Sequence, residues 1–172
     1  MTQTPPATYR YRFNVGIALF NTEGQVWLGK AISDGPEYVL PGHEWQMPQG
    51  GIDPSEDIII AARRELYEET GITAADYLAV TETWVAYDFP QPYALHGHRL
   101  EVFLGQQQRF VAFRFTGDER MIDLGATGPG FAPEFSEWRW ASLKEAVAGV
   151  MPYKRVSYAA MAQAFRRFAA AD

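Results

Sequence analysis

The segment from Gly50 to Ile72 constrains what this chain can fold into more than any other part of the sequence. It opens with two glycines and an Asp-Pro pair and closes near a further glycine, which predicts a turn, a helix and a second turn. Glu65, Glu68 and Glu69 lie at positions i, i+3 and i+4, so they share one helix face with Cβ atoms about 5–6 Å apart. Like charges at this spacing destabilise an isolated helix by roughly 0.2–0.5 kcal/mol per pair. A hard divalent cation with oxygen ligands offsets that repulsion, so the segment predicts one wall of a Mg²⁺ site.

Glutamate clusters on helices are commonly no more than a solvated face, but this cluster has a specific context. The residues around it follow the pattern Gly-x5-Glu-x7-Arg-Glu-U-x-Glu-Glu-x-Gly-U, in which U is aliphatic. Every fixed position is filled, by Gly50, Glu56, Arg64, Glu65, Leu66, Glu68, Glu69, Gly71 and Ile72. This pattern is the Nudix box, and the chain therefore resembles the Nudix hydrolases.

The composition indicates a globular protein without cysteine chemistry. The 172 residues are 47% hydrophobic and 15% aromatic, enough to bury a core in one domain. There is no cysteine, which excludes disulfides, thiolate zinc sites and a cysteine nucleophile. No stretch resembles a secretory signal or a membrane span, so we expect a cytoplasmic protein without a membrane partner. The net charge of -6 argues against bulk polyanion binding, and we expect no DNA partner.

Apolar periodicity and turn signals predict a single α/β domain over residues 1–172, with a mixed sheet between helices. Residues 1–8 are polar and proline-bearing, and we expect a flexible tail there. The first helix is expected to start at Ser55 as N-cap, with Glu56 and Asp57 in its first turn, and to end before Gly71. The other expected elements are strands near residues 15–20, 25–30 (its hairpin partner), 77–85, 108–115 and 135–140, and helices near 143–148 and 156–170.

The likeness to the family extends beyond the box, over roughly residues 11–168. The flanking motifs are Tyr11-Arg12-Phe13-Asn14-Val15-Gly16, Trp45-Gln46-Met47-Pro48-Gln49-Gly50-Gly51, Pro133-Glu134-Phe135-Ser136-Glu137-Trp138-Arg139-Trp140 and Tyr153-Lys154-Arg155. Their order is similar to that of bacterial RNA pyrophosphohydrolases and dinucleoside polyphosphate hydrolases. The resemblance implies a Nudix-type α/β/α sandwich with a central mixed β-sheet. It also implies Mg²⁺- or Mn²⁺-dependent hydrolysis of a nucleoside diphosphate linked to another group.

Two departures from that branch bear on the substrate. RNA-acting relatives tend to carry paired arginines at the end of the second strand, where this chain has Lys30 and Ala31. The loop from Ser33 to Glu44 is also longer than in the compact members. Both departures concern the RNA assignment more than the hydrolase assignment.

The chemistry of the reaction suggests a candidate catalytic set. Phosphoanhydride hydrolysis brings water to a phosphorus atom surrounded by negative oxygens, so cations must reverse the local charge of a carboxylate site. We hypothesise that Glu65, Glu68 and Glu69 hold two or more Mg²⁺ ions, with Mn²⁺ as a possible substitute, together with the backbone carbonyl of Gly50. The resemblance adds Glu134, either as a metal ligand or as general base. Glu65 is our first choice of base and Glu134 the alternative.

The motifs also suggest roles for five further residues. The resemblance implies that Arg64 pairs with a carboxylate and, with Glu56, braces the turn and the helix. Arg12 and Lys154 are placed to meet phosphates or a terminal base, although each can instead be an ordinary surface charge. Tyr153 can stack on a base or simply pack.

Three functions are compatible with these residues. The first is removal of pyrophosphate from the 5′-triphosphate end of RNA. The second is hydrolysis of dinucleoside polyphosphates such as diadenosine tetraphosphate, which offer the same phosphate chain with a second nucleoside. The third is a Nudix module that binds nucleotides without cleaving them, which the complete box disfavours.

Overall fold

The computed structural model describes residues 10–32, 39–90, 100, 102–125 and 132–170. The expected tail at residues 1–8 lies outside this part, as do residues 33–38 of the loop that starts at Ser33. The strands are β1 (Tyr11–Phe20), β2 (Val26–Ala31), β3 (Trp45–Gln46), β4 (Gln49–Gly51), β5 (Ala75–Val80), β6 (Val85–Asp88), β7 (Gly105–Phe115) and β8 (Phe135–Ala141). The helices are α1 (Ile58–Thr70), α2 (Leu143–Gly149) and α3 (Arg155–Phe165), with 3₁₀ turns η2 (Glu119–Met121), η3 (Pro152–Lys154) and η4 (Arg166–Phe168).

A mixed sheet forms the centre of the fold. Strands β1 and β7 are parallel neighbours over the whole length of β1, while the other pairings are antiparallel. The main path of the sheet runs β3-β2-β1-β7-β5, with β4 paired to β1, β6 to β7 and β8 to β2. From Asn14 to its end at Phe20, β1 is a continuous buried run, as expected for a strand covered on both faces.

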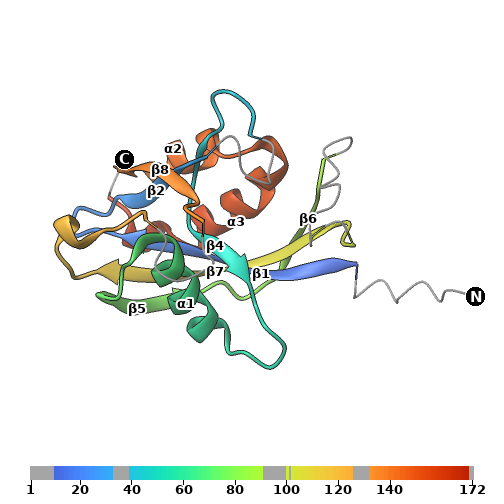
Figure 1. The fold of residues 1–172 in the computed structure, drawn as a ribbon, viewed down its shortest axis with the longest axis horizontal. Helices are drawn as coiled ribbons and strands as arrows, with labels where there is room; N and C mark the ends of the chain where they lie inside the picture. The colour runs from blue at the N-terminus through green and yellow to red at the C-terminus, as the bar shows by residue number, and fades with distance from the viewer. Residues whose placement is uncertain (1–9, 33–38, 91–99, 101, 126–131, 171–172) are drawn as a thin grey trace, which may run out of the picture.

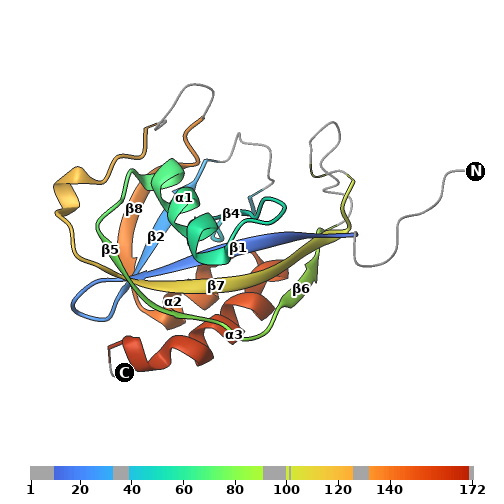
Figure 2. The same cartoon turned by 90° about the horizontal axis from the view of Figure 1, so that it is seen from below.

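The helices cover the two faces of this sheet separately. Helix α1 lies on one face, and α2 and α3 lie on the other (Figures 1 and 2). Alternate residues of β1 divide between two cores: Ile17 packs on the α1 side, whereas Phe20 packs on the α3 side. The apolar stripe on α3, with Tyr158, Met161 and Phe165, is buried in the second core, as predicted. The expected α/β/α sandwich is confirmed.

The predicted hairpin between β1 and β2 is wrong for most of its length. The chain does turn at residues 21–25, but β1 and β2 pair only at Phe20 and Val26. A strand has two edges, and β7 takes one edge of β1 while β4 pairs with residues 14–16 on the other. Strand β2 therefore pairs with β8 instead, over residues 26–31.

The predicted start of α1 is also wrong. Asp57, not Ser55, is the N-cap, and its carboxylate accepts hydrogen bonds from the amides of Ile59 and Ile60 at 2.9 and 3.2 Å. Ser55 instead has a positive φ of 67° in the preceding turn. Glu56 consequently lies before the helix and outside its first turn. The predicted end is confirmed, because Gly71 adopts the left-handed conformation with φ 70°.

Two other element boundaries differ from prediction. The strand expected at residues 77–85 is two strands, because Thr81 interrupts it: its hydroxyl accepts the amide of Phe110, which replaces a ladder hydrogen bond. The last helix ends at Phe165 and continues as the 3₁₀ turn η4. None of the helices formed by the described residues has the length and apolar character needed to span a bilayer.

Tyr158 connects α3 to the segment that leads into the β4 turn. Its side chain is fully buried, and its hydroxyl accepts a hydrogen bond from the amide of Met47 at 2.9 Å. We expect Tyr158→Phe to lower the free energy of unfolding by about 1–3 kcal/mol, because a buried N–H group loses this acceptor. Urea denaturation measures the change. Tyr77→Phe, at a half-exposed tyrosine on the other side of the sheet, should shift stability by less than about 0.5 kcal/mol; an equal loss in both variants would contradict this account.

Candidate active site

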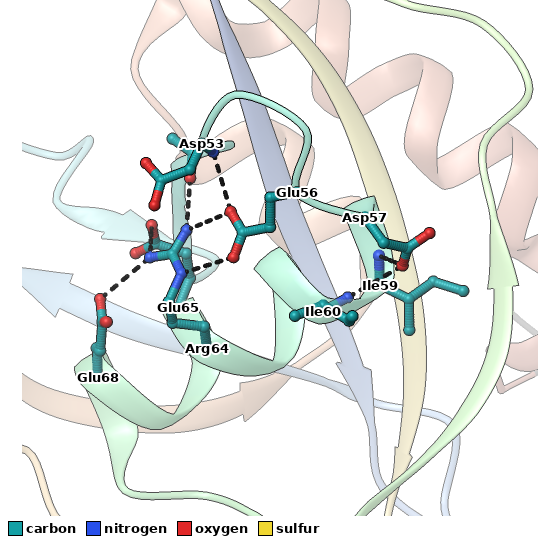
Figure 3. A network of polar contacts seen from close by, with 9 residues as sticks. Asp53, Glu56, Asp57, Ile59, Ile60, Arg64, Glu65 and Glu68 are labelled. Carbon is teal, nitrogen blue, oxygen red and sulfur yellow. Dashed lines mark hydrogen bonds and ion pairs between the residues drawn. The ribbon is translucent and has the colours of Figure 1, made fainter.

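Arg64 lies at the centre of a polar network that joins the β4 turn to α1 (Figure 3). Its guanidinium donates two parallel hydrogen bonds to the carboxylate of Glu56, both at 2.9 Å. It also donates to the carbonyl of Gly51 at 2.8 Å and to a carboxylate oxygen of Glu65 at 2.7 Å. A longer contact of 3.4 Å reaches Glu68. Only a planar group with several fixed donors can serve these partners together, which accounts for an arginine here.

Glu56 is held in the turn that precedes the helix. Besides Arg64, it accepts the amide of Asp53 at 2.9 Å, and its side chain is only 13% exposed. The hydrogen bonds from Arg64 hold the pKa of the Glu56 carboxyl below its usual value, against the opposing effect of burial. The predicted bracing contact between Arg64 and Glu56 is thus present in the structure.

Gly50 and Glu65 are in direct contact. A Cβ atom added at Gly50 would overlap the carboxyl group of Glu65, so no larger residue fits at this position. Burial raises the pKa of Glu65, while the neighbouring Arg64 lowers it and Arg12 lowers it further. The turn and the helix therefore bring the Gly50 backbone and a partly desolvated carboxylate side by side.

Glu69 lies one turn further along α1 and faces the same strand. One of its carboxylate oxygens accepts the backbone amide of Gln49 at 3.4 Å. Glu65 and Glu69 thus both contact β4, whereas Glu68 is held by Arg64. Arg64 supplies part of the positive charge that offsets their mutual repulsion.

The donor set suits a hard cation in chemistry, since it consists of carboxylate and carbonyl oxygens. In the described part of the chain, however, no three Asp, Glu, His or Cys side chains converge as a ready ligand set. The reason is visible in Figure 3, where Glu65 and Glu68 both turn toward the guanidinium of Arg64.

Arg12 lies against the β4 turn on strand β1. A Cβ atom added at Gly51 would overlap its guanidinium, and its charge acts on Glu65. Arg12 is therefore close to Glu65, and its role in substrate binding stays a prediction.

Lys154 is not the surface charge that the sequence left open as an alternative. It is 1% exposed, and its ammonium donates to the side-chain oxygen of Gln46 at 3.2 Å. The neighbouring Tyr153 packs against Tyr87, with ring centroids 5.8 Å apart, and Tyr87 donates to Gln106 at 2.7 Å. Both predicted substrate residues thus belong to a polar cluster between α3 and the sheet.

Glu134 lies immediately before β8 with an exposed side chain, and its carbonyl accepts the amide of Ile32. Its place in the catalytic set stays a prediction. Lys30 and Ala31 stand where RNA-acting relatives tend to carry paired arginines, and Lys30 forms an ion pair with Glu137 at 3.0 Å.

Comparison with known proteins identifies the family. A NUDIX domain model matches residues 10–164, most of the chain. The chain belongs to the Nudix family. It is 48% identical over 160 residues to an RNA pyrophosphohydrolase of Azorhizobium caulinodans, which covers 92% of this chain and 94% of that protein. The resemblance drawn from the sequence motifs is confirmed.

Solved structures of Nudix-like proteins share the fold at much lower identity. The E. coli dihydroneopterin triphosphate pyrophosphohydrolase aligns over 89% of this chain and 95% of its own, with a TM-score of 0.64 and 15% identity. A C. elegans Ap4A hydrolase in a binary complex aligns over 91% and 98%, with a TM-score of 0.57 and 16% identity. At this identity the likeness concerns architecture alone.

Sequence reasoning missed the buried amides of this Nudix site. Gln106 and Gln108 are 2% and 1% exposed on β7, and Asn14 is 1% exposed on the adjacent β1. The available signal was the alternation of Gln106 and Gln108 at the start of a strand whose following residues on that face are apolar. Buried amides of this kind require hydrogen-bond partners, which points to the polar site that contains them.

The Glu56 pair predicts a pH dependence of stability. Because the folded pKa of Glu56 lies below its ordinary value near 4.5, its contribution is fully present above about pH 4.5. It is lost as the pH falls through the lower folded pKa. We expect Glu56→Gln to be less stable than the parent by about 1–3 kcal/mol at pH 7, with the gap narrowing below about pH 4.5. Urea titrations at several pH values measure this, with exposed Glu23→Gln as control; a gap that stays constant down to pH 3 would exclude the mechanism.

Proposed function

We propose that this Nudix protein is an RNA pyrophosphohydrolase that removes pyrophosphate from the 5′-triphosphate end of RNA. The observation that carries the proposal is the 48% identity to a protein of that name over 94% of its length. The match spans 92% of this chain and therefore extends far beyond the box. The contacts of Arg64, Glu65 and Gly50 support a hydrolase, because the box residues are folded into one connected site. We further propose one catalytic domain over residues 1–172, acting in the cytoplasm.

Members of this family use divalent metal ions, and we propose Mg²⁺ here, with two or more ions and with Mn²⁺ as a substitute. Glu65, Glu68, Glu69, Glu134 and the carbonyl of Gly50 would hold them. The ions would supply positive charge beside the phosphates and lower the pKa of a bound water. The oxygen-only donor set is what supports a hard cation over zinc or copper.

The remaining roles follow from position. Glu65 is proposed as general base because it is largely buried beside Gly50, and burial raises its pKa toward the range of an effective base. Glu134 is the alternative base. Arg12 and Lys154 are proposed to bind phosphate oxygens or the terminal base, and Tyr153 to stack on a base. The burial of Lys154 supports this role, since a desolvated ammonium interacts more strongly with a phosphate.

Hydrolysis of dinucleoside polyphosphates is the second candidate, and one observation favours it. Lys30 is paired with Glu137 and is followed by Ala31, so the paired arginines of RNA-acting relatives are missing at this edge. A binding module without catalysis is a distant third candidate, because each box residue is kept and the Arg64 network is complete.

Replacing Glu69 tests the catalytic set. Glu69→Gln keeps a side-chain oxygen that can accept the amide of Gln49, so the fold should persist while the negative charge is lost. We expect kcat to fall by about 100-fold or more, the scale of losing one group that stabilises transition-state charge. Glu82→Gln, at an exposed glutamate between β5 and β6, should retain full activity. Near-normal turnover of Glu69→Gln, with unchanged circular dichroism, would remove Glu69 from the mechanism.

A side-by-side assay tests the substrate. 5′-triphosphorylated RNA and diadenosine tetraphosphate are hydrolysed in parallel with Mg²⁺ at one salt concentration, and kcat/KM is compared. We expect the RNA to be preferred by about 10-fold or more, since only RNA continues beyond the first nucleotide and makes additional phosphate contacts. The opposite preference would establish the dinucleotide as substrate. Hydrolysis of neither, by a folded protein, would support the binding module.

A further inference from the structure

Gln108 makes three side-chain hydrogen bonds in the interior of the fold. It lies in the first half of β7, is 1% exposed, and faces α3. Its amide nitrogen donates to the side-chain oxygens of Asn14 at 2.7 Å and Gln49 at 3.0 Å. Its amide oxygen accepts the hydroxyl of Ser157 at 2.7 Å. One side chain thus connects β1, β4, β7 and α3.

The chemistry at this position requires an amide. The nitrogen faces two acceptors and the oxygen faces a donor, so both ends of the group are used. A carboxylate would place an acceptor against the oxygens of Asn14 and Gln49, and an apolar side chain would leave both without this donor. Polar groups buried at this depth are costly to leave unsatisfied, by about 1–3 kcal/mol each. Gln108 therefore fixes the position of the Gln49 side chain.

Gln49 is the first residue of the turn that meets the catalytic helix. The backbone amide of Gln49 donates to the carboxylate of Glu69. The next residue, Gly50, is in direct contact with Glu65. A shift of Gln49 by a few tenths of an ångström must move the Gly50 carbonyl and the two carboxylates relative to one another. Ser157, on the far side of Gln108, ties this position to α3, which packs on the opposite face of the sheet from α1 (Figure 2).

We propose that Gln108 is a positioning residue for the active site, acting through Gln49 to set the geometry of the turn against Glu65 and Glu69. Ser157 orients its amide. The inference rests on the proposed function, since it assigns Gln108 a role in the metal-dependent reaction of that site. It requires that loss of the amide weakens metal binding and turnover more than it weakens the fold.

The test compares Gln108→Met, which keeps the length and removes the amide, with Thr81→Val. Thr81 is a matched control, because it is also buried, and the hydrogen bonds that the structure gives it go to Arg109 and Phe110 on β7. For each variant we would measure urea stability, kcat and KM on triphosphorylated RNA, and Mn²⁺ affinity of the substrate-free enzyme by electron paramagnetic resonance. We expect Gln108→Met to lose about 10- to 100-fold in kcat or in Mn²⁺ affinity. The KM of Gln108→Met for RNA should stay within about 3-fold of the parent value. Thr81→Val should keep the kcat, the KM and the Mn²⁺ affinity of the parent.

A double-mutant cycle shows whether Gln108 acts through Gln49. If it does, Gln49→Met lowers the same quantities, and adding Gln108→Met to it has little further effect. If the two substitutions instead lower kcat and Mn²⁺ affinity by factors that multiply, Gln108 and Gln49 act independently, and the proposal is overturned. So would a Gln108→Met variant whose kcat and Mn²⁺ affinity match those of Thr81→Val at equal stability.

Ser157→Ala keeps the inference testable if Gln108→Met fails to fold, because it removes only the hydroxyl that orients the amide. It should weaken Mn²⁺ binding and kcat in the same direction by a smaller factor, and unchanged values would count against the proposal. The Mn²⁺ measurement also separates the two claims. A parent enzyme inactive on RNA would end the proposed function, whereas the comparison of Mn²⁺ affinities would still decide the role of Gln108.

Discussion

The paired hydrogen bonds between Arg64 and Glu56 are the interaction on which the rest of the site depends. They join a turn of irregular backbone to a regular helix, and the same guanidinium binds the Gly51 carbonyl and Glu65. Most of its hydrogen-bonding capacity is therefore used within the turn and the helix. Because Glu56 must reach Arg64 from outside the helix, the N-cap moves to Asp57. One charge pair thus decides where the helix begins and where its carboxylates point.

A second polar network, formed by buried amides and Lys154, lies on the α3 side of the sheet and contacts the same turn as the Arg64 network. At the end of the sheet nearest the turn, the strand positions facing α3 carry amides, whereas further along the same face they carry apolar residues of the α3 core. The amide of Gln108 is satisfied by side chains from β1, β4 and α3, and Lys154 is buried beside Gln46. A buried network of this kind is rigid when all its members are paired, which suits a site that must hold several negative charges at fixed spacing.

Much of the fold was predictable because its elements have local causes. The apolar alternation of β1 and β7, the stripe on α3 and the stop at Gly71 each follow from short-range sequence patterns, and the structure contains all of them. The errors lie where another part of the chain intervenes. Strand β2 pairs with β8 and not along β1, because β4 pairs with that edge of β1. The strand predicted at residues 77–85 is divided at Thr81, whose hydroxyl accepts the amide of Phe110 on the neighbouring strand β7. The partners that caused these changes, β4, β8 and Phe110, all lie far in sequence from β2 and from residues 77–85.

The sequence by itself determined the family, the helix face that carries Glu65, Glu68 and Glu69, and the pairing of Arg64 with a carboxylate, because these depend on spacing within one segment. Only the tertiary structure decided that Arg64 forms ion pairs with Glu65 and Glu68 as well as with Glu56, and that Lys154 is buried. It also decided that Gln108 meets Gln49, which is far away in the chain. Helical periodicity fixes which residues share a face, but partners from distant strands are chosen by the packing of the whole sheet.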